Sequence, residues 1–302
     1  MRTILVIGAS GFIGRHIAQA LLAGGYAIRC LARNPAKVQD LATLGCEIVK
    51  GDISDLGSMK RALVSVQAVY IVIHTISPQS ASTADQRFMT VELNGLQNII
   101  TACQAHGARR LIYVTSLGIT ADASSEWLRE RWQAEQFLFD SGLDVTVIRP
   151  GMIVGAGGRG FGMVASQARK SVAIGMGGRQ KMRSIAVDDL IYYLVSVLND
   201  PRAYQQCYDV GNDDVLTNSQ MIDAVAELLG RGHPTKIKIP PTLVGALAPF
   251  IERMGKLPRG AVKGLVDSLK ADASGDPTPI RSILPRPLLS FRQAAERALV
   301  IR

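Results

Sequence analysis

A glycine-rich turn near the start of the chain constrains the fold more than any other feature. Gly8, Gly11 and Gly14 follow the β-branched run Ile4–Ile7 and open the amphipathic stretch Arg15–Ala23. Glycines at this spacing let the backbone approach a diphosphate, and the free N–H groups at a helix start attract the anion. A strand before the turn and a helix after it make the pattern specific. We therefore predict a dinucleotide-binding turn, the alternative being a βα turn whose glycines serve tight packing alone.

Strand and helix candidates alternate through the first half of the chain. This order predicts a parallel sheet covered on both faces by right-handed crossovers. The expected strands are Thr3–Ile7, Ile28–Ala32, Glu47–Val49, Ala68–Ile73, Arg110–Val114 and Val145–Arg149, and the expected helices are Gly11–Ala23, Pro35–Leu44, Leu56–Leu63, Val91–His106 and Trp127–Ser141. The predicted fold class is α/β, a doubly wound parallel Rossmann sheet.

The composition of the sequence changes after Pro150, where we predict a domain boundary. Residues 1–150 are expected to form the NAD(P)-binding Rossmann domain. Residues 151–302 are expected to form a smaller substrate or lid lobe that packs over the carboxyl edge of the sheet and does not fold independently. The cleft between the two parts would hold a substrate.

Four local patterns stand out in this second half. We expect a loop over the glycine-rich residues 151–178, a helix that Asp188 caps, a further strand at Cys207–Val210, and a capping box of Thr217 and Gln220. Residues 240–255 are apolar and interrupted by proline. This composition favours a core helix over an apolar face for a lipidic ligand or a partner.

Composition indicates a large aliphatic core and a reducing compartment. The chain has 302 residues, of which 47% are hydrophobic, enough for one large α/β domain or two modest ones. No apolar leader and no membrane span are expected. The four cysteines, Cys30, Cys46, Cys103 and Cys207, lack metal or redox spacing. We therefore expect reduced thiols, no metal site and a cytoplasmic protein.

The net charge of +9 comes mainly from the second half of the chain, which carries an excess of +7 against +2 in residues 1–150. Such an excess can attract an anionic substrate, a polyanion or a membrane surface. We favour a solvated basic face. No basic block is interleaved with aromatic residues, so no nucleic-acid partner is expected. The expected partner is a small-molecule substrate or none, and the oligomeric state stays open.

Residues that follow the second and third expected strands bear on the choice of cofactor. An acidic residue after the second strand would bind the ribose hydroxyls and repel a 2′-phosphate, but this chain has Arg33. A guanidinium suits a 2′-phosphate, so we predict NADP(H) in preference to NAD(H), the alternative being an ordinary loop arginine. Asp52, with Ile53 beside it, is expected to accept a hydrogen bond from the adenine amine. The alternative role of Asp52 is a helix N-cap, for which Ser54 or Asp55 is better placed.

His74 and Thr75 follow the fourth expected strand. Because the carboxyl ends of parallel strands share one edge, these residues are expected to flank the ribose and pyrophosphate of the cofactor. A lone histidine at such a position more often serves as a backbone spacer than as an acid or base.

Together these residues resemble the short-chain dehydrogenase/reductase superfamily, in its extended and atypical branches. The most similar groups are the NmrA-like and complex-I-subunit-like NAD(P)H-binding proteins. The likeness rests on the glycine turn, Gly51-Asp52, Asn94, the run Tyr113–Ser116, Arg149–Gly151 and Val187–Asp189. It implies a nicotinamide cofactor, with Pro150 near its ring and with Gly8, Ser10, Gly11, Phe12 and Ile13 around the pyrophosphate.

The chain departs from this superfamily at its catalytic pair. Active members carry a tyrosine and a lysine four residues apart on the helix after the fifth strand, with a serine before them. Counting back from Glu135, which fits a position one turn later, Arg131 replaces the lysine and Trp127 the tyrosine. Tryptophan is no useful proton donor, and arginine can hold a ribose but is a poor acid or base. Tyr113 lies within a strand and is expected to be buried. Ser116 takes the serine position, so Ser116 and Arg131 are the candidate catalytic residues.

Three functions remain open at this point. The first is an atypical NADP(H)-dependent reductase of a quinone or carbonyl-type small molecule, since hydride transfer depends mainly on alignment. The second is a non-catalytic NADP(H) sensor or complex-assembly protein. The third, a nucleotide-sugar epimerase or dehydratase, ranks last because such reactions also rely on the tyrosine.

Overall fold

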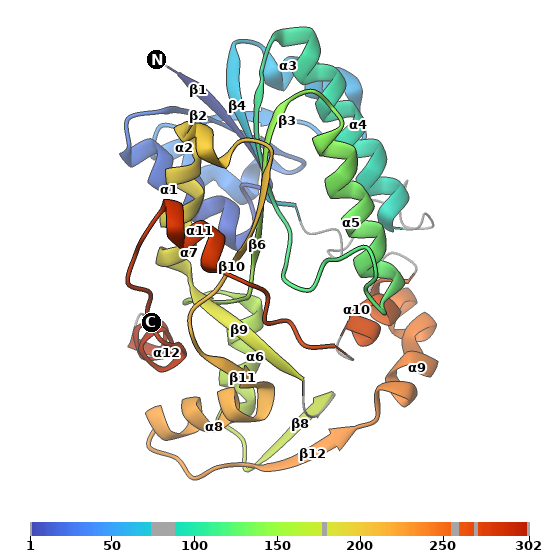
Figure 1. Ribbon diagram of the computed structural model, residues 1–302, viewed down its shortest axis with the longest axis vertical. Coiled ribbons are helices and arrows are strands. Elements are labelled where there is room, and N and C mark those ends of the chain that lie inside the picture. Colours follow the sequence, from blue (N-terminus) through green and yellow to red (C-terminus); the bar gives the residue numbers. More distant parts are fainter. Residues whose placement is uncertain (1, 74–87, 177–179, 255–259, 269–270, 301–302) are drawn as a thin grey trace.

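A seven-stranded parallel sheet forms the centre of the molecule, with helices on both faces (Figure 1). The computed structural model describes residues 2–73, 88–176, 180–254, 260–268 and 271–300. In spatial order the strands are β10 (Gln206–Val210), β6 (Asp144–Pro150), β5 (Arg110–Val114), β4 (Val66–Ile71), β1 (Thr3–Ile7), β2 (Ala27–Ala32) and β3 (Glu47–Lys50). Every neighbouring pair runs parallel. The predicted doubly wound Rossmann sheet is therefore confirmed.

The strand order reverses between β1 and β4, and this reversal locates the ligand crevice. In sheets of this type a ligand binds outside the carboxyl ends of the strands at the reversal point. The glycine turn leaves β1 at this position. The seventh strand, β10, comes from beyond residue 150, as the sequence of Cys207–Val210 suggested. The domain boundary at residue 150 stays a prediction.

Helices cover both faces of the sheet, because side chains of a strand alternate between the faces. On β1, Ile4 and Val6 pack into one cluster, while Leu5 and Ile7 pack into the other. The first cluster is covered by α1 (Phe12–Ala23), α2 (Gln39–Thr43) and α7 (Val187–Ser196), and the second by α3 (Leu56–Leu63), α4 (Phe88–His106) and α5 (Glu126–Phe139). The expected helix at Pro35–Leu44 is split into a 3₁₀ turn, Pro35–Val38, followed by α2.

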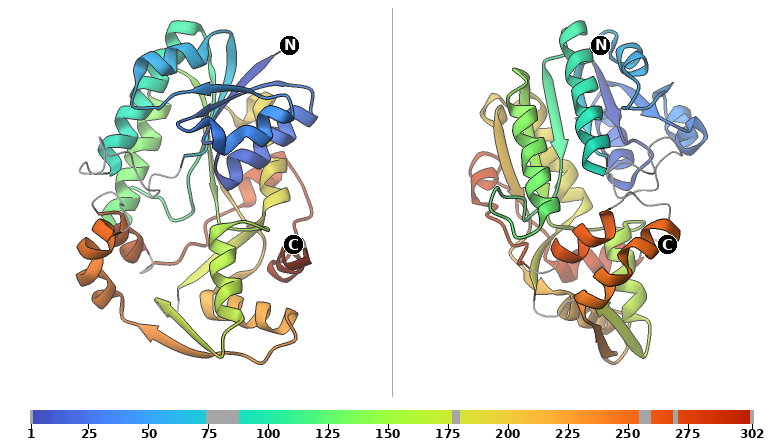
Figure 2. Two further views of the ribbon diagram at one scale, coloured as in Figure 1. Left: turned by 180° about the vertical axis from the view of Figure 1, so that it is seen from behind. Right: turned by 90° about the vertical axis from the view of Figure 1, so that its right-hand side faces the viewer.

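The second half also builds a lobe beside the carboxyl edge of the sheet (Figure 2). Its elements are β7 (Met152–Val154), α6 (Arg159–Ala168), β8 (Val172–Met176), β9 (Lys181–Ala186), β11 (Val215–Thr217), α8 (Asn218–Leu228), β12 (Thr235–Ile239), α9 (Pro241–Met254), α10 (Ala261–Ser268), α11 (Thr278–Ile283) and α12 (Phe291–Val300). Two small sheets form here, one of β11, β9 and β7 and one of β12 and β8. A hydrophobic cluster of this lobe joins α6, α8 and α12 through Phe161, Met221 and Phe291.

The loop expected over residues 151–178 was wrong for residues 151–176, and residues 177 and 178 lie outside the described residues. Phe161, Val164, Ala165 and Ala168 are buried at helical spacing, so this stretch contains α6 between two strands. The glycines obscured that apolar stripe, because glycine content alone favours a loop. Gly155 instead permits close packing, since an added Cβ there would lie 2.9 Å from the Phe12 ring.

The helix caps of the second half agree with the sequence in one case and differ in the other. Thr217 and Gln220 form the predicted capping box, in which the Gln220 N–H donates to Thr217 Oγ1 at 3.2 Å. The expected cap by Asp188 was wrong, because Ala186 is the N-cap of α7. Asp188 lies instead in the first turn, where a carboxylate interacts favourably with the helix dipole.

The core helix expected at residues 240–255 was also wrong in its environment. The helix α9 forms, but only Ala248 and Glu252 are buried among its described side chains. Leu243 and Phe250 are 54% and 65% exposed. Apolar composition alone does not distinguish a buried helix from one that presents an apolar face to its surroundings.

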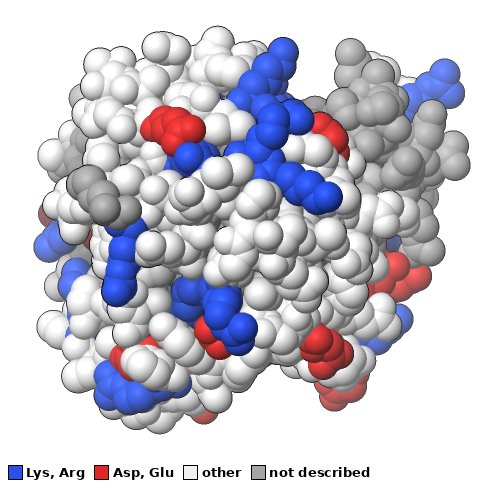
Figure 3. Space-filling model, turned by 90° about the horizontal axis from the view of Figure 1, so that it is seen from above, with Lys and Arg blue, Asp and Glu red and all other residues white. Residues whose placement is uncertain are grey.

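The four cysteines are free thiols, as predicted. Over the described residues, no helix has the length and apolarity needed to cross a bilayer. Seen from above, Lys and Arg side chains lie among largely uncharged surface with Asp and Glu between them, apart from one short run of basic groups (Figure 3). This face therefore does not present a continuous basic surface.

Candidate cofactor and substrate site

The glycine turn has the close contacts that a phosphate-binding turn requires. Gly8 has a φ of +96°, and a Cβ added there would lie 2.5 Å from the Val72 carbonyl oxygen. An added Cβ on Gly14 would lie 2.2 Å from the carbonyl oxygen of Gly8. The Gly11 N–H donates to the same oxygen at 2.9 Å. Gly8 and Gly14 are thus required by the fold of the turn, while Gly11 stands exposed at its outer side.

The N-terminus of α1 is open to an anion. Gly11 is its N-cap, no described side chain caps it, and no acidic residue lies in its first turn. The free N–H groups and the positive end of the helix dipole therefore face the crevice without a competing carboxylate. Ser10 is exposed beside Gly11, and Phe12 and Ile13 are half-buried in the first turn of the helix.

Arg33 follows the last residue of β2 and is exposed. It forms no ion pair with any residue in the part of the chain that the structure describes. Arg15 on α1 is engaged differently: its guanidinium contacts Asp40 and donates to the Lys37 carbonyl at 2.7 Å. The same contact lowers the pKa of Asp40. Of these two arginines, Arg33 is the one left available to an added phosphate at the end of β2.

Asp52 and Ile53 lie in the loop between β3 and α3. Asp52 Oδ1 accepts hydrogen bonds from the backbone N–H and the hydroxyl of Ser54, both at 2.9 Å. The alternative role of Asp52 as a cap is excluded, because Asp55 caps α3. Ile53 is held by Asn98 Nδ2, which donates to its carbonyl at 2.9 Å. The role of Asp52 at an adenine stays a prediction.

His74, Thr75 and Pro150 were also predicted to contact the cofactor, and the structure describes only Pro150. His74 and Thr75 lie outside the described residues. Pro150 is the buried last residue of β6, and its carbonyl accepts a hydrogen bond from Leu117 N at 3.1 Å. Its proximity to a nicotinamide ring stays a prediction.

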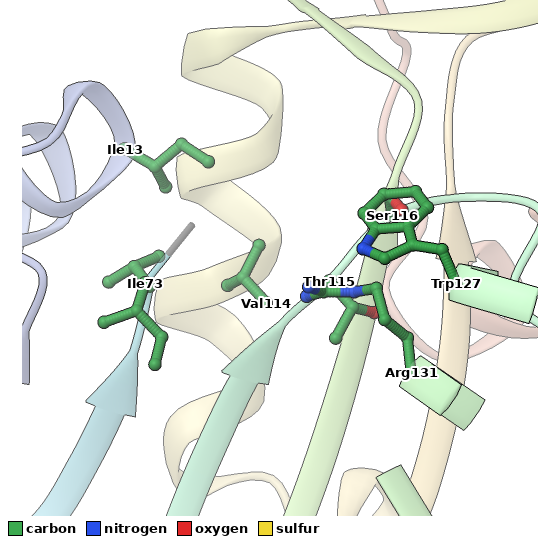
Figure 4. Close-up of a pocket in the computed structure, with 8 residues that line it drawn as sticks. Ile13, Ile73, Val114, Thr115, Ser116, Trp127 and Arg131 are labelled. Atoms are coloured by element: carbon green, nitrogen blue, oxygen red, sulfur yellow. The ribbon is translucent and has the colours of Figure 1, made fainter. Parts of the chain in front are cut away.

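A pocket opens beside the glycine turn at the carboxyl ends of β4 and β5 (Figure 4). Its cavity volume is about 60 Å³, within an empty space of about 370 Å³ that is open to solvent. The lining is mostly apolar and comprises Ile13, Val72, Ile73, Val114, Thr115, Ser116, Trp127 and Arg131. The two candidate catalytic residues, Ser116 and Arg131, are therefore brought together although they come from different elements. Figure 4 shows Arg131 reaching from α5 toward the end of β5, next to the Trp127 ring.

Arg131 belongs to a buried polar network. Its Nη1 donates to Glu92 Oε2 at 3.2 Å, and its Nη2 contacts the Tyr113 hydroxyl at 3.5 Å. The Tyr113 hydroxyl also donates to Glu92 Oε1. Arg131 is 4% exposed, and Glu92 and Tyr113 are fully buried. The guanidinium centre lies 5.4 Å from the centre of the Trp127 ring, in a cation–π arrangement.

The protonation states of this network follow from its geometry. Burial lowers the pKa of Arg131, but the nearby Glu92, Tyr113 and Glu135 together more than offset this effect, so the net pKa of Arg131 is raised. Burial, and then the Glu92 carboxylate, raises the pKa of Tyr113 well above its ordinary value. Arg131 is therefore a permanent cation, and Tyr113 is a neutral phenol committed to Glu92. Neither group is poised to exchange a proton near neutral pH.

A second network fixes the helix that carries Arg131. Glu135, one turn further along α5, is fully buried and accepts hydrogen bonds from Arg149 Nε at 3.1 Å and Thr115 Oγ1 at 2.7 Å. Burial lowers the pKa of Arg149, but the hydrogen bond and charge of Glu135 raise it overall. These contacts tie α5 to β5 and β6, so the pocket wall has a defined position.

Sequence reasoning missed Glu92. A signal was present, because Glu92, Leu96, Ile99 and Cys103 follow one helical stripe that the structure buries. A carboxylate in an apolar stripe requires a buried partner. That partner, Arg131, lies on another helix, so the pairing itself was not visible in the sequence.

Comparisons with known proteins identify the family of the chain. A family model described as NAD(P)H-binding matches residues 8–201, more than half of the chain. Subunit 9 of the mitochondrial NADH dehydrogenase (ubiquinone) 1 alpha subcomplex of Arabidopsis thaliana is 24% identical over 80% of this chain and 61% of its own length. The (4-alkanoyl-5-oxo-2,5-dihydrofuran-3-yl)methyl phosphate reductase of Streptomyces griseus is 26% identical over 98% of both chains. For several other curated relatives, the match spans about half of their length.

Solved structures show the same fold. The NADPH complex of an NADPH-dependent quinone oxidoreductase from Escherichia coli aligns with a TM-score of 0.75 and 22% identity, over 98% of this chain and 99% of that one. Such a likeness establishes the architecture and not the activity. On the family match and these relatives, the chain belongs to the NAD(P)H-binding family, with homologues in the NmrA-like and complex-I-subunit-like group.

Proposed function

We propose that this protein is an atypical NADP(H)-dependent reductase of a quinone or another small carbonyl-type molecule. The observation that carries the proposal is the apolar pocket, which adjoins the open N-terminus of α1 and holds Ser116 and Arg131 in its wall. A hydride acceptor lying in this pocket would be close to the crevice in which the family binds its cofactor. The full-length reductase relative from Streptomyces supports the same direction.

The described residues fit the cofactor in two respects. The turn around Gly8 and Gly14 has no room for side chains, and the helix start beyond it has no cap, as a diphosphate site requires. In the pocket wall, Nε of the buried Arg131 has no hydrogen-bond partner among the described residues. A buried donor of this kind suits a ligand hydroxyl. When bound, NADPH supplies a hydride from its nicotinamide ring.

We assign Arg131 to binding and Ser116 to orientation. The guanidinium keeps its charge and can hold ribose hydroxyls, in the place where the superfamily carries a lysine. Ser116 can donate a hydrogen bond to the oxygen of an acceptor. Since Trp127 occupies the tyrosine position and Tyr113 is committed to Glu92, neither supplies the proton. An acceptor that takes its proton from water, such as a quinone, fits this pocket better than a ketone that needs a tyrosine acid.

A second candidate is a non-catalytic NADP(H) sensor or complex-assembly protein. The replacement of the tyrosine by Trp127 favours it, and so does the burial of Tyr113. In this reading the cofactor would order the second lobe, because Phe12 of the phosphate turn packs against Gly155 and Gly158 beyond residue 150. An epimerase or dehydratase of nucleotide sugars ranks third, since no tyrosine lines the described pocket.

One experiment distinguishes these candidates. We expect the purified chain to bind NADPH and to oxidise it when a panel of benzoquinones and naphthoquinones is added, measured by the loss of absorbance at the nicotinamide band. Tight binding in calorimetry without oxidation of NADPH by any quinone would reject the reductase in favour of the sensor. A nucleotide sugar that copurifies with the chain would favour the third candidate.

Arg33→Asp tests the proposed preference for NADP(H). The substitution removes a charge-assisted contact with the 2′-phosphate and adds repulsion, so NADPH affinity should fall roughly 10- to 100-fold. Affinity for NADH should hold or rise, because a carboxylate can accept hydrogen bonds from ribose hydroxyls. Arg109→Asp is the matched control, since Arg109 is 71% exposed beside the amino end of β5 and away from the crevice. If the affinity for NADPH and the affinity for NADH were both the same in Arg33→Asp as in the wild type, Arg33 would not be part of the cofactor site.

We further propose a reducing compartment, the cytoplasm. The four free cysteines support this placement, because burial raises the pKa of the Cys103 and Cys207 thiols to about 12 and keeps them unreactive.

A further inference from the structure

One helix of the second lobe presents an apolar face that no described element covers. Along α9, Leu243, Leu247, Phe250, Ile251 and Met254 are between 37% and 72% exposed. At a helical step of about 100° per residue, these five side chains fall within an arc of about 100°. The helix lies at the margin of the molecule, next to α10 (Figure 2). Large apolar side chains gathered on one exposed face mark an interaction surface.

The adjoining face of α9 is attached to the protein. Val244 and Ala248 pack against Val262 and Val266 of α10. The Glu252 carboxylate accepts hydrogen bonds from Gly260 N at 3.1 Å and Val262 N at 2.8 Å. The orientation of α9 is therefore set by its own contacts, and its exposed apolar face lies to the side of α10.

The helix α10 is in turn seated on the Rossmann half of the molecule. An added Cβ on Gly264 would lie 2.7 Å from the Trp127 Cβ, so α10 and α5 are in close contact. Ser125 Oγ also donates to the Gly264 carbonyl at 3.4 Å. The apolar face is thus carried at a defined position relative to the pocket.

The exposed charges of α9 and α10 are basic, and the acidic Asp267, one turn from Lys263 on α10, is half-buried. The carboxylate of Glu252 is 7% exposed and is directed into the start of α10. Arg253 of α9 and Lys263 of α10 are both exposed. At helical spacing Arg253 lies beside Phe250, at the border of the apolar arc. Long basic side chains in this position can extend to an anionic surface while their stems lie along apolar groups.

We propose that the apolar face of α9 docks on an anionic lipid membrane, with the helix lying in the plane of the interface. An apolar stripe bordered by Arg253, with the Glu252 carboxylate turned toward α10, matches what such a surface recognises. A second copy of this chain is a poorer occupant, because two copies of a protein of net charge +9 repel each other. The proposal is independent of the reductase activity.

The test is sedimentation of the full chain with vesicles. We expect binding to vesicles of phosphatidylcholine and phosphatidylglycerol, weaker binding to phosphatidylcholine alone, and a loss of binding as salt is raised. Leu247→Glu/Phe250→Glu should lower the partition coefficient at least about tenfold, because two apolar contacts are replaced by charges that anionic lipid repels. Leu44→Glu/Val64→Glu is the matched control, since both residues are about half exposed but lie on the Rossmann half.

Two further variants separate the contributions. Arg253→Gln/Lys263→Gln should lower binding to anionic vesicles by roughly fivefold per charge and leave binding to neutral vesicles unchanged. Phe250→Trp should show a blue-shifted emission on addition of anionic vesicles. NADPH affinity in every variant reports that the fold is intact.

Several outcomes would overturn the proposal. One is the failure of the wild-type chain to bind anionic vesicles at low salt. Another is equal loss of binding in the control variant. A third is a wild-type dimer in analytical ultracentrifugation that Phe250→Glu converts to a monomer, because the face would then belong to a second copy.

Discussion

Gly11→Val is expected to abolish measurable NADPH binding while the protein stays folded. The Gly11 backbone is extended, with φ −84° and ψ 170°, a conformation that valine adopts readily. An added Cβ would lie 3.2 Å from the Gly8 carbonyl oxygen, a contact that a small shift relieves. The isopropyl group would instead occupy the space from which a diphosphate approaches the α1 N–H groups. Loss of two charge-assisted hydrogen bonds of about 1.5 kcal/mol or more each corresponds to a Kd increase of about 100-fold or greater.

Calorimetric titration with NADPH, combined with thermal unfolding, measures both parts of this prediction. The loss of a glycine N-cap should cost about 1 kcal/mol of stability at most. Gly232→Val is the matched control, because a Cβ added there meets no atom within 4 Å. Wild-type affinity in Gly11→Val would exclude the turn as the phosphate site, and a comparable loss in Gly232→Val would show that the effect is not local.

Arg131→Met is expected to lower the free energy of unfolding by about 3–5 kcal/mol, because it leaves the buried Glu92 carboxylate without its guanidinium. The double variant Glu92→Gln/Arg131→Met should recover most of this loss, since a neutral amide oxygen still accepts the Tyr113 hydroxyl hydrogen bond. Urea unfolding at pH 7 measures the series. Arg109→Met should change stability by less than about 0.5 kcal/mol, as expected of an exposed arginine.

The double variant Glu92→Gln/Arg131→Met also distinguishes a role of Arg131 in stability from a role in cofactor binding. It should fold and still bind NADPH weakly, because the glycine turn is intact, but it should lack the guanidinium in the pocket wall. We expect a higher KM for NADPH in quinone reduction, or a higher Kd if the protein only binds. A stable double variant with wild-type NADPH affinity and turnover would confine Arg131 to a structural role.

The first half of the fold was accessible from the sequence because its signals are local. On β1, residues 4–7 form a short apolar run that is buried on both faces, and such a run predicts a central strand of a parallel sheet. The glycine turn follows it directly. In contrast, the count of glycines in residues 151–178 concealed the buried stripe of α6. The glycine count is an average over the whole stretch of residues. The burial of a side chain depends instead on whether its position lies on the same helix face as other apolar positions.

The candidate site was accessible in part. Ser116 and Arg131 were singled out by their positions relative to a family pattern, and the structure places both in one pocket wall. Glu92 was not found, because its partners lie 21 and 39 residues away on β5 and α5. Such a pairing is decided by how α4 and α5 pack together on the sheet.

The sequence alone determined the strand–turn–helix seat for a dinucleotide, the parallel sheet behind it and the absence of a tyrosine acid at the expected position. These properties depend on residue identity and on spacings of a few residues. Only the tertiary structure decided that Arg131 is locked to Glu92 and Tyr113, and that α9 leaves its apolar face uncovered. The physical reason is that burial and ion pairing depend on which distant segments come into contact, and the free energy of those contacts exists only after the chain has folded.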